Sequence, residues 1–161
     1  MRRSKLDSID RRILADLQDN GRMTNVELAE RSGISAPPCL RRLRALEEDQ
    51  IILGYHAEIN AEALDYKITA FVHVKLSSNN DHDLRKFEET LMNLPQVREC
   101  FLLVGDFDFL LRVVAKSWDD YQKFLSSELT NIAHVAQIKS SLAVRRSKFA
   151  PGVPIEEITK K

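Results

Sequence analysis

Several features that mark particular protein classes are scarce or missing in this chain of 161 residues. No apolar run is long enough to cross a membrane as a helix, and no apolar stretch follows the charged start as in a secretory signal. Only two cysteines are present, Cys39 and Cys100, and their separation fits no metal-binding spacing. We therefore expect no membrane partner, and a reducing cytoplasm is the expected compartment.

The chain also lacks an excess of charge of either sign, since 24 Lys and Arg residues balance 24 Asp and Glu residues. This balance argues against a simple basic nucleic-acid-binding protein. The four histidines show no metal-ligand spacing, so we expect neither a metal centre nor a cofactor. The charges are nevertheless sorted locally, because residues 33–46 contain three arginines and no acidic residue.

Residues 24–48 carry the most informative pattern, which is two short helices joined by a tight turn. Thr24 and Glu27 have the spacing of a capping box, which begins a helix. Gly33 can end that helix in a left-handed conformation. Ser35 is the expected cap of the next helix, and prolines fit the first turn that follows. The pattern predicts a helix-turn-helix, whose second helix can lie in the major groove of DNA.

The second helix of this motif carries most of the candidate DNA contacts. Its three arginines cannot all face one way, since a helix turns by about 100° per residue. Some should reach phosphates, and one could pair bidentately with a guanine edge. Ser35 and the free amides at the helix start can hold a phosphate, and Asn25 could hold the DNA backbone from the flanking side. The predicted DNA-binding residues are Asn25, Ser35, Pro37, Arg41, Arg42 and Arg44.

Two residues of this helix have alternative interpretations. For Arg42 the alternative to a DNA contact is a surface ion pair with an acid of its own domain. Cys39 is expected to face the core, as a small buried hydrophobic residue and not as a thiol sensor.

We expect two domains joined by a hinge. Apolar residues at helical spacing between Leu6 and Leu17 predict a further helix before the motif. Ile51, Ile52 and residues 55–59 are expected to form a strand that closes the first domain. The predicted boundaries are 1–59 for the DNA-binding domain, 60–67 for the hinge, 68–150 for the second domain and 151–161 for the C-terminal tail.

Beyond the hinge the pattern becomes typical of alternating strands and helices. Strands are predicted over 68–76, 97–104, 107–115 and 137–144, and helices over 81–93 and 118–131. Gly105-Asp106 is a turn signal that joins the second and third strands as a hairpin. The order β-α-β-β-α-β is that of a ferredoxin-like domain, so the whole chain is predicted to be α+β.

Motifs in both halves resemble one family of bacterial transcription regulators, the Lrp/AsnC family. The matching segments are 6–14, 17–18, 20–22, 27–29, 33–35, 38–43, 46–47 and, in the second half, the run that begins Gly105-Asp106-Phe107-Asp108-Phe109. Residues 140–143, 148 and 154–156 resemble one branch, in which some regulators respond to small amino acids such as cysteine. Asp65 stands where relatives often have glycine.

The resemblance implies a winged N-terminal DNA-binding domain and a C-terminal ferredoxin-like domain that dimerises through its sheet and often builds octamers. It also implies an amino-acid effector where dimers meet, near the Gly-Asp turn. A carboxylate can pair with the ammonium of such a ligand, while turn amides and serine hydroxyls hold its carboxylate. The candidate effector-binding residues are Val104, Gly105, Asp106, Phe107, Asp108, Ser140 and Ser141. Purely structural roles in the turn stay open for Asp106 and Asp108.

The expected function is therefore transcription regulation, with double-stranded DNA, a small amino acid and further copies of the chain as partners, and no enzymatic activity. Two alternatives stay open. Some haem-precursor decarboxylases resemble this arrangement, but they would need a cationic pocket for tetrapyrrole carboxylates, and the sequence shows no clustered His and Arg pair. An architectural DNA-organising protein would show little sequence preference and no response to an amino acid.

Overall fold

The computed structural model describes residues 6–78 and 80–156. The first five residues of the expected DNA-binding domain and the last five of the expected tail lie outside the described residues. The chain divides into two units, one from Ile59 to Ser147 and one that combines the residues up to Glu58 with those from Lys148 onward. The first unit is thus discontinuous in sequence, whereas the tail was expected to stand apart.

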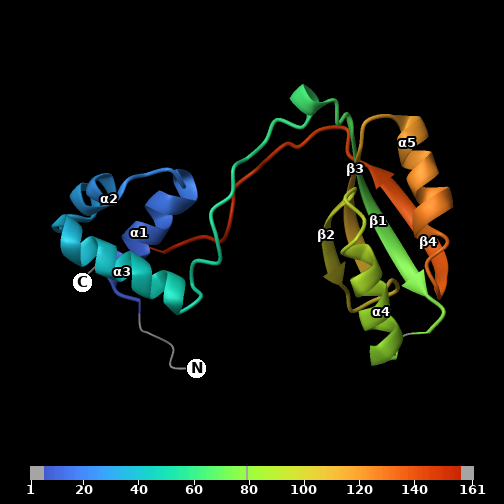
Figure 1. Ribbon diagram of the computed structural model, residues 1–161, viewed down its shortest axis with the longest axis horizontal. Coiled ribbons are helices and arrows are strands. Elements are labelled where there is room, and N and C mark those ends of the chain that lie inside the picture. Colours follow the sequence, from blue (N-terminus) through green and yellow to red (C-terminus); the bar gives the residue numbers. More distant parts are fainter. Residues whose placement is uncertain (1–5, 79, 157–161) are drawn as a thin grey trace. The chain divides into compact units, whose positions relative to one another are not determined.

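The first unit contains the three helices that the sequence predicted for it (Figure 1). They are α1 (Ser8–Asp19), α2 (Asn25–Ser32) and α3 (Ala36–Glu48). A reciprocal capping box between Thr24 and Glu27 begins α2, as predicted. Gly33, with φ at 68°, ends α2 in the left-handed conformation that the sequence predicted. A second capping box, between Asp7 and Asp10, begins α1.

Apolar side chains from all three helices form the core of this unit. Its buried members are Ile13, Leu28, Ala29, Cys39 and Leu46. Cys39 is 0% exposed, which confirms the prediction that it packs as a small hydrophobic residue. Burial raises the pKa of its thiol, which disfavours the reactive thiolate further.

One acidic side chain lies among these apolar ones. Asp16 on α1 is 4% exposed, and its Oδ1 lies 2.8 Å from Nη2 of Arg31 on α2. Arg12 Nε approaches the other carboxylate oxygen at 3.3 Å. A buried carboxylate needs partners of this kind, so the pair fixes how α1 and α2 pack.

The prediction of a strand at the end of the first unit is wrong. Residues 51–59 follow no regular structure, and the amides of Ile51 and Ile52 both donate to the carbonyl of Leu46, at 2.9 and 3.0 Å. These bonds close the end of α3 as a turn. A strand needs a neighbouring strand to pair with, and the described part of this unit offers none.

The second unit is an antiparallel sheet with helices. Its elements are β1 (Ile68–Leu76), α4 (Asp81–Leu91), β2 (Val97–Leu102), β3 (Phe109–Ala115), α5 (Trp118–Lys123), η2 (Phe124–Leu129) and β4 (Val135–Leu142). The strand order is β2-β3-β1-β4, and all three neighbouring pairs are antiparallel. This order confirms the ferredoxin-like prediction and the α+β class.

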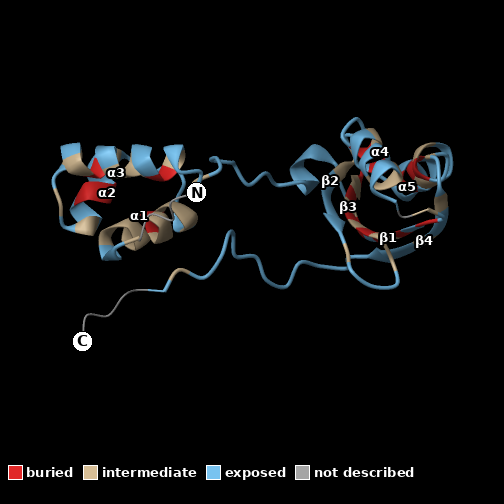
Figure 2. Cartoon of the chain, turned by 90° about the horizontal axis from the view of Figure 1, so that it is seen from below, coloured by how far each residue is buried: buried red, intermediate tan, exposed pale blue. Residues whose placement is uncertain are grey.

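Both helices cover the same face of the sheet (Figure 2). The strand residues that face the helices are fully buried, among them Val72 and Val74 on β1 and Leu111 on β3. The opposite face is open in the single chain, and it includes Phe71, which is 39% exposed, and Phe101, which is 52% exposed. An apolar side chain on the uncovered face of a sheet is available to a partner.

The last helix is less regular than its sequence predicted. After α5 the helix continues as η2, a π-helix of six residues, which has a wider turn than an α-helix. This widening places Phe124 and Leu129, five residues apart, on the same buried side, where both are at most 1% exposed.

A short 3-10 helix, η1 (Glu62–Leu64), lies before the sheet. Asp65 follows it with φ at 63°, a left-handed conformation. Glycine adopts this conformation without steric cost, whereas Asp65 holds a side chain there.

Candidate nucleic-acid interface and effector site

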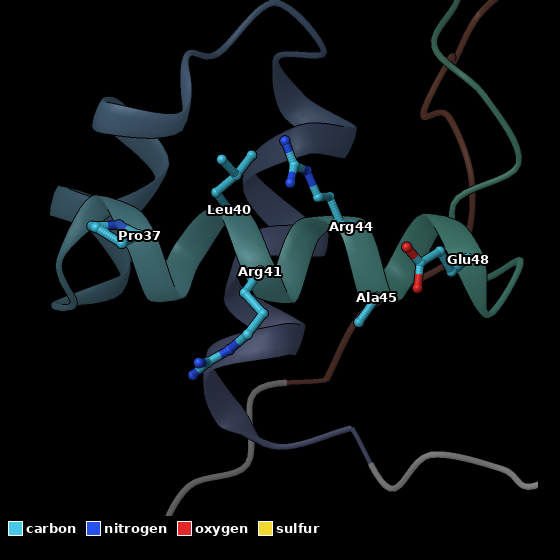
Figure 3. A pocket seen from close by; sticks show the side chains of 6 residues that line it. All are labelled: Pro37, Leu40, Arg41, Arg44, Ala45 and Glu48. Carbon is cyan, nitrogen blue, oxygen red and sulfur yellow. The ribbon is translucent and has the colours of Figure 1, made fainter.

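One face of α3 points away from the core of its own unit (Figure 3). A shallow depression of about 370 Å³ follows this face, lined by Pro37, Leu40, Arg41, Arg44, Ala45 and Glu48. Residues at these spacings share one side of a helix, while Cys39 and Leu46 face the core on the other side. We call the six lining residues the outward face of α3.

Arg41 and Arg44 both belong to the outward face. Their guanidinium groups extend to either side of the helix, away from the core (Figure 3). Neither forms an ion pair with another described residue. Two unpaired cations beside exposed apolar side chains make a surface that can meet phosphates and base edges.

Arg42 lies elsewhere. Its Nη1 donates to Oδ1 of Asp10 at 2.7 Å and to Oδ2 of Asp7 at 2.8 Å, so it ties α3 to the start of α1. The hydrogen bonds to Asp10 and then to Asp7 raise the pKa of Arg42. The alternative interpretation, an ion pair within the domain, therefore describes Arg42 better than the predicted DNA contact does.

Two further predicted DNA contacts have local roles. Asn25 Nδ2 donates to the carbonyl of Ala36 at 2.9 Å, which joins the first residue of α2 to the first residue of α3. Ser35 stands at the cap position of α3, as predicted, but its side chain makes no capping hydrogen bond. Pro37 in the first turn has no amide hydrogen to satisfy, which reduces the need for such a cap.

The predicted effector loop joins β2 to β3, as the hairpin signal indicated. Asp108 anchors it, because its Oδ2 accepts from the amide of Leu76 at 2.7 Å and its own amide donates to Val74 at 3.0 Å. Asp106 is exposed, and its carboxylate has no hydrogen bond or ion pair with any described residue. Asp108 thus has the structural role that stayed open, whereas Asp106 is free to meet a ligand.

The loop reaches the open face of the sheet through an aromatic contact. The rings of Phe107 and His73 have centroids 5.3 Å apart and planes tilted by 52°. His73 Nδ1 is buried and has no hydrogen-bond partner among the described residues. His73 was not among the predicted site residues, although its place between Val72 and Val74 on a strand puts it on the open face.

The two serines of the candidate site are separated from this loop. Ser140 and Ser141 lie on β4, where they pair with Val72 and Phe71, so their side chains point to opposite faces. Tyr121 donates to Ser140 Oγ at 2.7 Å on the helix-covered side. Because β1 lies between β4 and β3, about 10 Å separates the serines from the strand that carries the loop. One chain alone does not bring the predicted effector residues together.

Residues 6–78 and 80–156 contain no cluster of three or more His, Cys, Asp or Glu side chains placed to hold a metal ion. None of the helices described there has the length and apolar character that crossing a bilayer requires.

Comparison with known proteins assigns both units. Residues 6–52 match the family model for winged helix-turn-helix DNA-binding domains. Residues 69–153 match the model for the Lrp/AsnC ligand binding domain.

The most similar relatives include the leucine-responsive regulatory protein of Rhizobium meliloti, which is 48% identical over 95% of this chain and 98% of the relative. The Bkd operon transcriptional regulator of Pseudomonas aeruginosa is 41% identical over 94% of this chain and 99% of its own. Among solved structures, a transcriptional regulator of Neisseria meningitidis in complex with L-Met has a TM-score of 0.90 at 33% identity, covering 96% of this chain and all of that one. The chain belongs to the Lrp/AsnC family of transcriptional regulators.

Proposed function

We propose that the chain regulates transcription by binding specific double-stranded DNA through the outward face of α3, as a homodimer or larger assembly whose DNA affinity responds to an amino acid. The observation that carries this proposal is the division of the α3 arginines. Arg42 is held by Asp7 and Asp10, whereas Arg41 and Arg44 are exposed and unpaired among the described residues. A helix that is held to α1 on its core side and carries cations on its outward face has the features of a recognition helix.

The outward face offers both kinds of contact that sequence reading requires. A guanidinium can pair bidentately with guanine or hold a phosphate, which are the roles proposed for Arg41 and Arg44. Pro37 and Leu40 add apolar surface to the same face, suited to a thymine methyl group. Ser35 and the free amides at the start of α3 are proposed to hold a phosphate. Asn25 and Arg42 act by keeping α3 in place.

A second copy of the chain follows from the energetics of DNA binding. One small unit neutralises few phosphates and binds weakly. A two-fold dimer would present two recognition helices about 34 Å apart, or a multiple of that distance. Phe71 and Phe101, exposed on the open face of the sheet, support dimerisation through that face. Octamers would form from such dimers and add avidity.

The proposed effector is a small amino acid held partly by the 104–108 loop. Asp106 would pair with its ammonium group, and Ser141 of a second copy would hold its carboxylate, because one chain keeps these residues apart. His73, with its unpartnered ring nitrogen beside Phe107, is a further candidate contact. The names of two relatives, one leucine-responsive and one complexed with L-Met, support Leu and Met as the first ligands to test, with cysteine beside them.

The relatives are named as transcriptional regulators, and we propose that this chain likewise has no enzymatic activity and acts in the cytoplasm, where its DNA lies. The test is an anisotropy titration against DNA from upstream of its own gene and against a scrambled duplex of equal composition, with each of the twenty amino acids. Preference for the upstream DNA that one amino acid shifts would support the proposal. Equal binding of both duplexes without any shift would favour an architectural protein, and absence of binding would contradict DNA recognition altogether.

A further inference from the structure

Residues 153 and 156 contact α1. Gln18 on α1 holds Val153 by two hydrogen bonds: Nε2 donates to the carbonyl of Val153 at 2.9 Å, and the amide of Val153 donates to Oε1 at 3.0 Å. Arg11, seven residues earlier on α1, donates through Nη1 to the carbonyl of Glu156 at 3.3 Å. Side chains two turns apart on one helix thus hold the backbone of the segment at two points.

Gly152 is fitted to this contact in two ways. Its φ is 67°, a conformation that a residue with a side chain adopts only with strain. A Cβ at this position would also overlap the side-chain carbonyl of Gln18. A side chain at position 152 would therefore be strained and would push the Gln18 amide away from Val153.

We propose that α1 carries a docking surface for residues 148–156 of its own chain, here called the strap, and that the strap forms a second tether between the two units. The chain passes between the units once near Glu58 and again near Lys148. Because the strap is already attached to the second unit, its effective concentration at α1 is high, so a few polar contacts suffice to hold it.

A second tether has a mechanical consequence for DNA binding, and this part of the inference rests on the proposed function. A unit on a single flexible linker samples many orientations, and binding to DNA must remove that freedom. With two tethers, part of this entropy is already lost before DNA is met. A dimer with docked straps should therefore gain more from a second half-site than a dimer whose straps are free.

Docking itself is tested by hydrogen–deuterium exchange of the full chain. We expect Gln18→Ala and Gly152→Ala each to speed exchange of the Val153 amide, which donates to Gln18 Oε1, by roughly tenfold in peptides covering residues 150–156. Gly21→Ala is the matched control, since the nearest atom to its new Cβ, the carbonyl oxygen of Leu17, lies 3.8 Å away. A wild-type strap that exchanges like a free peptide, or a Gly152→Ala strap that stays protected, would overturn the proposal.

The second arm compares DNA affinity for a duplex with two half-sites and for the same duplex cut to one. We expect Gln18→Ala and Gly152→Ala to reduce the advantage of the second half-site several-fold and to leave single-site affinity as in Gly21→Ala. If the strap of these variants exchanges rapidly but the second half-site still increases their affinity as much as in wild type, the tether proposal is wrong. A wild-type protein that binds no DNA would instead contradict the proposed function, and the exchange measurement would still decide the docking.

Discussion

Arg42 Nη1 lies 2.7 Å from Oδ1 of Asp10, and this contact fastens α3 to the first turn of α1. The neighbouring guanidinium of Arg41 extends from the outward face instead (Figure 3). Arg42 thus stabilises the packing of α3 against α1, whereas the adjacent Arg41 is exposed on the outward face. Mutation can separate these two roles.

Arg41→Ala and Arg44→Ala should each weaken DNA binding. A lost bidentate pair with guanine costs about 1–3 kcal/mol and relaxes the preference for that base. A lost phosphate contact weakens all sequences alike and reduces the slope of log affinity against log salt by about one. Affinity for specific and scrambled DNA over a range of salt concentrations distinguishes the two. Arg85→Ala, an exposed arginine on α4, controls for the charge removed.

Arg42→Ala should act on stability. The substitution removes the ion pairs to Asp7 and Asp10, and we expect a loss of about 1 kcal/mol, seen as a lower Tm. Measured well below that Tm, DNA affinity should fall less than in Arg41→Ala. An unchanged Tm together with an affinity loss as large as that of Arg41→Ala would return Arg42 to the DNA contacts.

The start of α1 should be sensitive to acid. The hydrogen bond from the backbone amide of Asp10, aided by Arg42, lowers the pKa of Asp7 from its ordinary value of 3.8. Because the folded pKa lies below the unfolded one, this stabilisation is present above about pH 3.8 and is lost as pH falls through the folded pKa.

Asp7→Asn removes the titrating group but keeps a side chain that can cap the helix. We expect the variant to lose less stability than wild type when urea unfolding is followed from about pH 5 down to pH 3. Identical pH profiles for the two proteins would show that Asp7 does not contribute to the acid sensitivity.

Substitutions of Asp106 and Asp108 in the 104–108 loop should have different effects, the first on ligand binding and the second on stability. Asp106→Ala should leave unfolding unchanged and weaken binding of L-methionine or L-leucine in calorimetric titration, because its free carboxylate is the proposed ammonium partner. Asp108→Ala should destabilise the protein by about 1–3 kcal/mol, because the amide of Leu76 loses its acceptor. Unaltered ligand binding in Asp106→Ala would leave Asp106 with a role in the turn alone.

Local patterns in the sequence predicted most elements well. The run of β-branched and aromatic residues over Ile68–Leu76 coincides with β1, and the capping box at Thr24 begins α2 where expected. The capping box depends only on neighbours in sequence. The β1 prediction held because β3 and β4 supply its pairing partners. The strand expected over residues 55–59 failed because a strand depends on a partner that the pattern does not contain.

Contacts between distant segments could not be predicted in the same way. The hydrogen bond between Gln18 and Val153 joins residues 135 positions apart, and no hydrophobic periodicity in either segment indicates it. Arg42 was more accessible to prediction, because it stands three residues after buried Cys39 and four before buried Leu46. That spacing turns it toward the core side of α3 and away from Arg41.

The discontinuous first unit has a consequence for the order of events during biosynthesis. Its three helices are made before the sheet unit, whereas residues 148–156, which contact α1, are made only after it. Gln18 and Arg11 on α1 are therefore translated well before Val153 and Glu156, and the contacts between them can form only after the sheet unit has been made.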